Sequence, residues 1–225
     1  MTKLSVVIPT MNEEGSIGLV MDDIEGSMPP SMDYEVIVVD TDSKDRTREI
    51  ASSKGARIVS EPRRGYGRAY KTGFENAKGE FIATLDADRT YPAGRIPEIV
   101  GMLDAEKLDF VTTNRFAELQ PGAMNFTHRF GNWILAVAAR LLFRVKLRDS
   151  QSGMWVFRRA SLPKMHLTSD GMSLSEEIKI EAFKNLRAKE VPIRYSPRIG
   201  EVKLNTWRDG KNNLKFLFKK RFGRT

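Results

Sequence analysis

Apolar and polar positions follow one another in blocks that predict strands and helices in alternation. Short apolar runs bounded by turn residues predict buried strands over Leu4–Pro9, Tyr34–Asp40, Ala56–Ser60, Glu80–Asp86 and Asp109–Thr113. The segments between them predict helices over Glu13–Ser27, Thr47–Lys54, Gly67–Ala77 and Arg95–Glu106. Because strands and helices that alternate at this spacing are typical of a mostly parallel sheet covered on both faces, we expect an α/β fold.

The pattern changes after Asn114, where longer helices are predicted. A long helix is expected over Phe126–Val145, followed by a strand over Gly153–Phe157, a helix over Ser173–Asn185, a strand over Glu190–Tyr195 and a closing helical segment over Lys211–Phe222. No internal repeat or low-complexity linker interrupts the chain. We therefore expect one domain over residues 1–205 and a C-terminal extension over residues 206–225.

The amino-acid composition excludes some kinds of functional site, and the length of the apolar runs bears on where the chain is located. The 225 residues include no cysteine, which excludes disulfides, thiolate metal sites and cysteine nucleophiles. The longest uninterrupted apolar run, Trp133–Ala139, is far too short to cross a bilayer. The chain is therefore expected to be soluble or peripheral to a membrane.

Positive charge is concentrated near the C-terminus. The chain carries 37 Lys and Arg against 29 Asp and Glu, and six of the basic residues lie in the last fifteen, which contain no acid. The rest of the chain is nearly neutral. This distribution argues against a nucleic-acid-binding surface and favours a local anionic partner.

Acidic side chains follow three of the predicted strands. They are Glu13 and Glu14 after the first strand, Asp40 and Asp42 at the end of the second, and Asp86 and Asp88 after the fourth. Because ligands of open α/β sheets bind beyond the carboxyl ends of the strands, these groups are expected at one rim. Carboxylates grouped in this way repel one another unless a cation or hydrogen-bond donors compensate them.

The Asp86-Ala-Asp88 pair is the sharpest chemical signal. Two carboxylates two residues apart can hold Mg²⁺ or Mn²⁺, which usually completes its shell with water and substrate phosphate. A loop with two solvated acids is the commoner explanation of an isolated pair. The buried strand that precedes it favours a metal–diphosphate site.

The ordered motifs VVIPTMNE, VIVVD with SKDRT, GYGRAYKTGFENAKGEF, LDADRTYP, TNRF and DSQSGMWVFRR carry a family resemblance. Over residues 3–205 the chain resembles family 2 glycosyltransferases of the GT-A type, and within them polyprenyl-phosphate (dolichyl-phosphate) hexose synthases. The resemblance implies a GT-A nucleotide-sugar-binding fold with a mostly parallel central sheet flanked by helices. An amphipathic, basic C-terminal helix is expected to follow it.

The resemblance also implies roles for matching residues. Nucleotide binding is implied for Pro9, Met11, Glu13, Asp40 and Asp86. A divalent metal, Mg²⁺ or Mn²⁺, is implied at Asp86, Asp88 and Thr90, where the family often has glutamine at the third position. Catalytic roles are implied for Asp88 and Arg115. Binding of the acceptor or diphosphate is implied for Arg129, Ser152, Arg198 and Lys203.

The implied reaction is inverting transfer of a hexose from a nucleotide diphosphate sugar, with UDP-glucose or UDP-N-acetylglucosamine favoured, to a polyprenyl phosphate. GDP-mannose is an alternative donor. A non-lipid acceptor is an alternative that would need Glu176 or Glu177 as a base, although Glu176 also predicts a capping box with Ser173. Outside enzymes, the alternative is a non-catalytic nucleotide-sugar-binding subunit.

The C-terminal segment suggests contact with a membrane. Leu214, Leu217, Phe218 and Phe222 share one helical face that basic residues flank, which is typical of a helix lying on an anionic membrane. Docking of this face on the core is the alternative. The resemblance implies a peripheral enzyme of protein glycosylation on the cytoplasmic side, and it allows an integral membrane subunit as partner. No nucleic-acid partner is expected.

Overall fold

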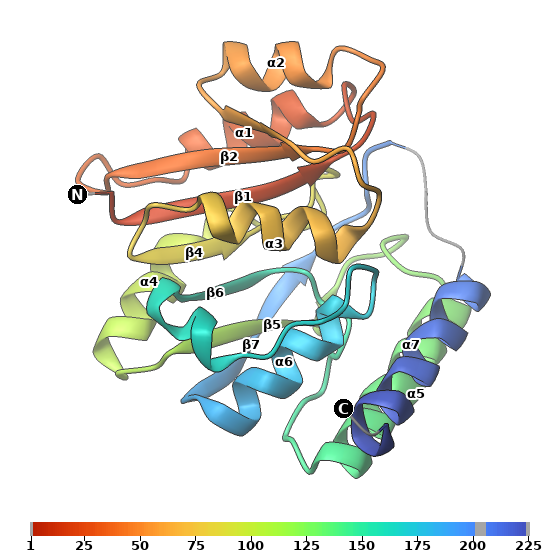
Figure 1. The fold of residues 1–225 in the computed structure, drawn as a ribbon. Coiled ribbons are helices and arrows are strands. Elements are labelled where there is room, and N and C mark those ends of the chain that lie inside the picture. Colours follow the sequence, from red (N-terminus) through yellow and green to blue (C-terminus); the bar gives the residue numbers. More distant parts are fainter. Residues whose placement is uncertain (1, 201–205, 224–225) are drawn as a thin grey trace.

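The computed structural model describes residues 2–200 and 206–223, and a seven-stranded sheet forms its centre (Figure 1). The strands are β1 (Leu4–Thr10), β2 (Tyr34–Asp40), β3 (Arg57–Ser60), β4 (Phe81–Thr84), β5 (Phe110–Leu119), β6 (Trp155–Arg158) and β7 (Ala188–Tyr195). The helices are α1 (Ile17–Glu25), α2 (Thr47–Ser53), α3 (Tyr66–Asn76), α4 (Arg95–Ala105), α5 (Phe126–Phe143), α6 (Leu174–Asn185) and α7 (Thr206–Phe222), with a 3₁₀ helix η1 (Arg159–Lys164).

The sheet is mostly parallel, as the sequence predicts. Its strand order is β3-β2-β1-β4-β6-β5-β7, and only β6 runs antiparallel to its neighbours β4 and β5. Strands β1 and β4 pair directly, while β2 lies on the other side of β1. The chain passes from β1 to β2 and β3 on one side, and the connection through α3 then returns to β4 on the other side of β1. This reversal of the strand order opens a crevice at the carboxyl end of β1.

Successive side chains of a strand point to opposite faces of the sheet, and a layer of helices covers each face. Val6 and Ile8 of β1 belong to a buried cluster that includes apolar side chains of α1 and α4. Val7, between them, belongs to the cluster on the other face, which includes side chains of α3 and α6. Because both faces are covered, the central strands are apolar throughout instead of alternating with polar residues.

Helix α3 approaches the sheet closely at Gly73. A Cβ atom at this position would overlap Cγ1 of Val7 and lie 3.1 Å from Cγ2 of Val39. At the start of the same helix, Gly65 and Gly67 lie against backbone carbonyls of residues 169–171, in the loop before α6.

The Gly73→Ala variant is expected to lower the free energy of unfolding by about 2 kcal/mol, since valine side chains in a strand have little freedom to yield. Gly101→Ala in α4 is the matched control, because no heavy atom lies within 4 Å of its added Cβ. The control is expected to be neutral or more stable by up to about 1 kcal/mol. Urea denaturation of both variants measures the difference, and equal stabilities would contradict the packing described.

Helix α1 and strand β5 differ by more than two residues from their predicted bounds, as does α7, which begins at Thr206 and not at Lys211. Helix α1 begins at Ile17 and not at Glu13, because the backbone N–H groups of Asn12 and Glu13 donate to Ser43 Oγ (2.8 Å) and Thr47 Oγ1 (2.7 Å) of the next loop. Strand β5 continues to Leu119, since its second half pairs with β7 after a shift in register. The differences in α1 and β5 depend on contacts that are distant in sequence.

Helices α5 and α7 lie side by side beside α6 (Figure 1). Leu217 of α7 is fully buried with Leu135 and Ala139 of α5, and Leu214 packs against the same cluster. Lys220 forms ion pairs with Glu177 (3.0 Å) and Glu181 (2.9 Å) of α6. Of the predicted apolar face of α7, Leu214 and Leu217 therefore dock on the core, while Phe218 and Phe222 are exposed.

Within the described part of the chain, no helix combines the length and apolar character that crossing a bilayer requires.

Candidate active site

Two cavities meet at the carboxyl end of the sheet. The larger, of about 520 Å³, is lined at the ends of β1 and β2 by Pro9, Thr10, Met11, Glu13 and Thr41. The smaller, of about 210 Å³, is lined by Arg115, His128, Asn132, Gln151 and Tyr195. Asp86 and Asp88 line both cavities, so the acidic pair that follows β4 lies at their junction.

Two tyrosines of α3 hold the Asp86 carboxylate. The hydroxyls of Tyr66 (3.2 Å) and Tyr70 (3.1 Å) both donate to its Oδ1. Burial raises the pKa of Asp86 to about 7, and the negative charge of Asp88 adds to the increase. The site therefore concentrates more negative charge than its own hydrogen-bond donors compensate.

Asp88 is fixed by its own turn and faces a basic residue. Its Oδ1 accepts from the backbone N–H (3.1 Å) and the hydroxyl (2.7 Å) of Thr90, while its Oδ2 lies 3.4 Å from Nη2 of Arg198. Thr90 thus orients the carboxylate, and its coordination of a metal stays a prediction. The Nε–H of Arg198 is buried and donates to no partner among the described residues, which suits an anion in the adjoining cavity.

The acidic pair fits a hard divalent cation. The described residues contain no cluster of three or more His, Cys, Asp or Glu side chains placed to hold a metal. Mg²⁺ bound together with a phosphate substrate needs only one or two carboxylates. Asp86 and Asp88 repel one another in a cavity that Arg198 also lines. A divalent ion would neutralise the two carboxylates, and a diphosphate bound with the ion would face Arg198.

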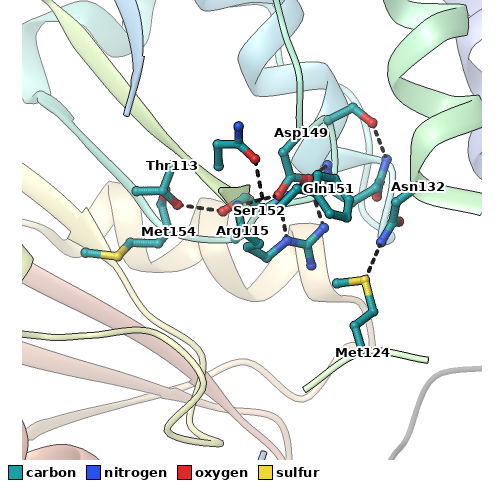
Figure 2. Close-up of polar contacts among 12 residues, drawn as sticks. Thr113, Arg115, Met124, Asn132, Asp149, Gln151, Ser152 and Met154 are labelled. Atoms are coloured by element: carbon teal, nitrogen blue, oxygen red, sulfur yellow. Dashed lines mark hydrogen bonds and ion pairs between the residues drawn. The ribbon is translucent and has the colours of Figure 1, made fainter. Parts of the chain in front are cut away.

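Arg115 projects from β5 and is held by Asp149 (Figure 2). Its Nε (2.7 Å) and Nη2 (2.9 Å) donate to the two carboxylate oxygens, and its backbone N–H also donates to Asp149 (3.0 Å). Burial by itself would raise the pKa of Asp149, but the Arg115 charge outweighs it and holds the value at about 2. This fixed guanidinium lines the smaller cavity and is available to a phosphate there.

Not every predicted residue lines a cavity. Asp40 is buried behind Thr41 and accepts from Thr10 and Ser43, while Ser152 is buried with its Oγ 2.6 Å from Thr113 Oγ1. Arg129 is exposed on α5, next to the cavity residue His128. Lys203 lies outside the described residues. The roles expected of these four stay predictions.

The glutamates considered as bases are both fully buried and line neither cavity. Glu176 accepts from Gln151, and Glu177 accepts from Thr168 and Ser169. The predicted capping box is wrong, because Ser173 makes no side-chain cap and donates instead to Asn213.

Sequence reasoning missed several residues that shape the site. They are Tyr66, Tyr70, Tyr91, Asn132, Tyr195 and Asn213. Gln151 lies in the DSQSG segment that contributes to the family resemblance. Only the two tyrosines of α3 carry a usable signal, since a spacing of four residues places both on one face of the predicted helix. His128 is half-buried at the smaller cavity. Burial and the nearby Arg115 lower its pKa.

The sequence profile of glycosyl transferase family 2 matches residues 5–165, which include Asp86 and Asp88. The chain belongs to glycosyl transferase family 2. The matched range contains β1 from its second residue, the strands β2 to β6 and the helices α1 to α5, so the family similarity covers most of the sheet.

Among curated relatives, the chain is 36% identical over 217 residues to the low-salt glycan biosynthesis hexosyltransferase Agl6 of Haloferax volcanii, covering 95% of this chain and 52% of that protein. The chain thus spans about half the length of this relative. It is 34% identical to a dolichyl-phosphate hexose transferase of the same organism, covering 92% and 89%. It is 27% identical to the dolichol-phosphate mannosyltransferase of Pyrococcus furiosus, covering 96% and 62%.

Solved structures confirm the fold. Glucosyl-3-phosphoglycerate synthase from Mycobacterium tuberculosis, in a complex with Mn²⁺, UDP and glucosyl-3-phosphoglycerate, superposes with a TM-score of 0.79 and 23% identity, covering 99% of this chain and 81% of that one. The same enzyme with Mg²⁺ and UDP gives 0.76 and 23%, covering 99% and 80%. The α/β architecture predicted from the sequence is therefore that of known glycosyltransferase structures.

Proposed function

We propose that this chain is a metal-dependent, inverting hexosyltransferase that acts on a nucleotide diphosphate sugar and a polyprenyl phosphate. One observation carries the proposal. The acidic pair lies where a cavity at the ends of β1 and β2 meets a second cavity that Arg115 lines. A nucleotide sugar whose diphosphate lies at this junction has its nucleoside in the larger cavity and its sugar in the smaller one. The Arg115 guanidinium in the smaller cavity is suited to an acceptor phosphate.

The reaction needs few groups from the protein. An ionised oxygen of the acceptor phosphate attacks the anomeric carbon, the bond from that carbon to the diphosphate breaks, and the bonding electrons leave with the diphosphate. A phosphate monoester is largely ionised at neutral pH, so no base is required. This agrees with the burial of Glu176 and Glu177 away from the cavities. Arg115 orients the acceptor phosphate, and Arg198 compensates charge on the diphosphate.

A divalent ion bound at Asp86 and Asp88 would supply Lewis-acid stabilisation of the leaving diphosphate. Mn²⁺ and Mg²⁺ in complexes of glucosyl-3-phosphoglycerate synthase with UDP support this choice of ion. UDP in those complexes also supports a UDP-sugar as donor. The dolichyl-phosphate hexose transferase among the relatives supports a lipid phosphate as acceptor.

Transfer of radiolabelled sugar tests the proposal. The purified chain is incubated with UDP-glucose, UDP-N-acetylglucosamine or GDP-mannose, with Mn²⁺ or Mg²⁺ and dolichyl phosphate. We expect label from one donor to enter the organic phase only when metal and acceptor are both present. Label that stays in the aqueous phase with every donor would contradict the proposed function.

A membrane surface is proposed as the place where the acceptor is met. Except for Leu19, the large apolar side chains exposed among the described residues lie on α5 and α7, and they are Phe126, Phe130, Trp133, Ile134, Leu141, Phe218 and Phe222. Exposed basic residues, including Arg129, Arg140 and Lys219, flank them. Aromatic and basic side chains together are typical of helices at an anionic interface. The cytoplasmic location and an integral partner stay predictions.

The Phe130→Ser/Trp133→Ser variant is expected to bind vesicles of phosphatidylglycerol and phosphatidylcholine at least about tenfold more weakly, because each aromatic contributes roughly 1.5–3 kcal/mol when buried. Leu19→Ser is the matched control, since Leu19 is exposed on α1, away from α5 and α7. Sedimentation with vesicles measures the effect. Equal losses in the variant and the control would contradict an α5 membrane surface.

A further inference from the structure

A continuous chain of hydrogen bonds joins α7 to the loop that holds Arg115. Ser173 Oγ donates to Asn213 Oδ1 (2.8 Å), Asn213 Nδ2 donates to Gln151 Oε1 (3.1 Å), and Gln151 Nε2 donates to Glu176 Oε2 (2.9 Å). A flip of one amide alone would place two acceptors or two donors against each other. The neighbours on both sides therefore fix the direction of both amide groups.

Both amides are also part of the cavity walls. Asn213 lines the two cavities and Gln151 lines the smaller one. An amide nitrogen has two hydrogens and an amide oxygen has two lone pairs. Asn213 uses one of each within the chain of bonds, and the second contact of Gln151 Nε2, with Ser150 Oγ, is long at 3.4 Å. Each side chain therefore keeps hydrogen-bonding capacity beside the cavity.

The position of a bound sugar follows from that of its diphosphate. Under the proposed function, on which this inference rests, the anomeric carbon is attached to a diphosphate at Asp86 and Asp88. The hexose ring must then occupy the adjoining smaller cavity, whose walls include Gln151 and Asn213. Hexose hydroxyls both donate and accept, and side-chain amides offer both functions.

We infer that Gln151 and Asn213 form a hexose-recognition pair, in which fixed amides hydrogen-bond the ring hydroxyls of the sugar being transferred. The C-terminal helix α7 is thereby a wall of the active site. Its position is well defined, because Leu217 is buried against α5 and Lys220 pairs with glutamates of α6. Because their neighbours in the chain of hydrogen bonds fix both amides, the pair selects sugars by the positions of their hydroxyls.

Affinities for a nucleotide with and without its sugar test the inference. We compare the full chain with Asn213→Ala and Gln151→Ala by calorimetry in Mn²⁺, using UDP against UDP-glucose and UDP-N-acetylglucosamine, and GDP against GDP-mannose. Each variant is expected to bind the diphosphate within about twofold of the parent and the matching sugar nucleotide about tenfold more weakly, as the loss of one or two hydrogen bonds predicts.

Two further variants separate recognition from folding. Leu214→Ala loosens the packing of α7 without altering either amide, so it is expected to lower the unfolding midpoint and leave the sugar-dependent difference unchanged. Lys211→Ala changes an exposed residue of the same helix and is expected to alter neither quantity.

The outcomes distinguish the inference from the proposed function. If the parent binds no diphosphate and no sugar nucleotide, both fail. If the parent binds them but Asn213→Ala and Gln151→Ala weaken the diphosphate and the sugar nucleotide equally, or weaken neither, only the recognition pair is wrong. A sugar-specific loss that Leu214→Ala reproduces would also overturn it, because the amides would then act only through the stability of α7.

Discussion

Replacement of Asp88 by asparagine is expected to reduce hexose transfer by about a thousandfold. The substitution keeps the size of the side chain but removes one of the two carboxylates at the junction of the two cavities. A bound divalent ion contributes several kcal/mol to stabilising a leaving group, and about 4 kcal/mol corresponds to this change in rate. Initial rates of transfer to dolichyl phosphate measure it.

The control for this variant is Asp22→Asn, which removes an exposed carboxylate on α1 that pairs with Lys54. Transfer by the control is expected to equal that of the parent. Circular dichroism of both variants should show that the fold is retained. Undiminished transfer by Asp88→Asn would contradict a metal role for this residue.

Replacement of Asp149 by asparagine is expected to destabilise the protein by about 3 kcal/mol, because it leaves the buried guanidinium of Arg115 without a counter-charge. For a chain of this size, that loss corresponds to a decrease of about 6–12 °C in the unfolding midpoint. Transfer is expected to fall as well, since Arg115 loses the two bonds that orient it towards the smaller cavity.

Asp23→Asn is the matched control, because Asp23 makes a two-pronged ion pair of the same kind with Arg89 at the surface. Exposed pairs contribute about 0–1 kcal/mol, so its midpoint should change little. Equal decreases of the unfolding midpoint in the two variants would contradict a stabilising role of the buried Arg115–Asp149 pair.

The contribution of the Asp149 carboxylate to the free energy of unfolding also depends on pH. Its pKa of about 2 in the folded protein lies below the value of about 3.9 for an unfolded aspartate. The contribution to stability is therefore complete above about pH 4 and is lost as the pH falls towards 2. The difference in unfolding free energy between the parent and Asp149→Asn should shrink over that interval, and urea titrations at several pH values measure it.

The sequence predicts the strands and the acidic rim because both are local properties. Apolar runs mark β1, β2 and β4, and the residues that follow them include Asp86 and Asp88. The antiparallel position of β6 was not predicted, since pairing with β4 and β5 brings together segments far apart in the chain. The late start of α1 has the same origin, in contacts with the loop after β2.

Much of the smaller cavity could not be predicted for the same reason. Gln151 and Asn213 are separated by 62 positions, and nothing near either residue indicates that they meet. The sequence also favours a helix cap for Ser173, whose hydroxyl donates to α7 in the folded chain. The amphipathic pattern of α7 is equally consistent with docking and with membrane contact. Its leucines dock, while Phe218 and Phe222 are exposed.

Binding of nucleoside diphosphates in the presence and absence of metal shows whether Asp86 and Asp88 hold a cation together with a diphosphate. UDP and GDP are titrated by calorimetry into the unmodified protein, once with Mn²⁺ and once with EDTA. We expect one of the two to bind at least about tenfold more tightly with Mn²⁺, a difference of about 1.4 kcal/mol or more. Equal affinity with Mn²⁺ and EDTA, or no binding of either diphosphate, would contradict a cation held at Asp86 and Asp88.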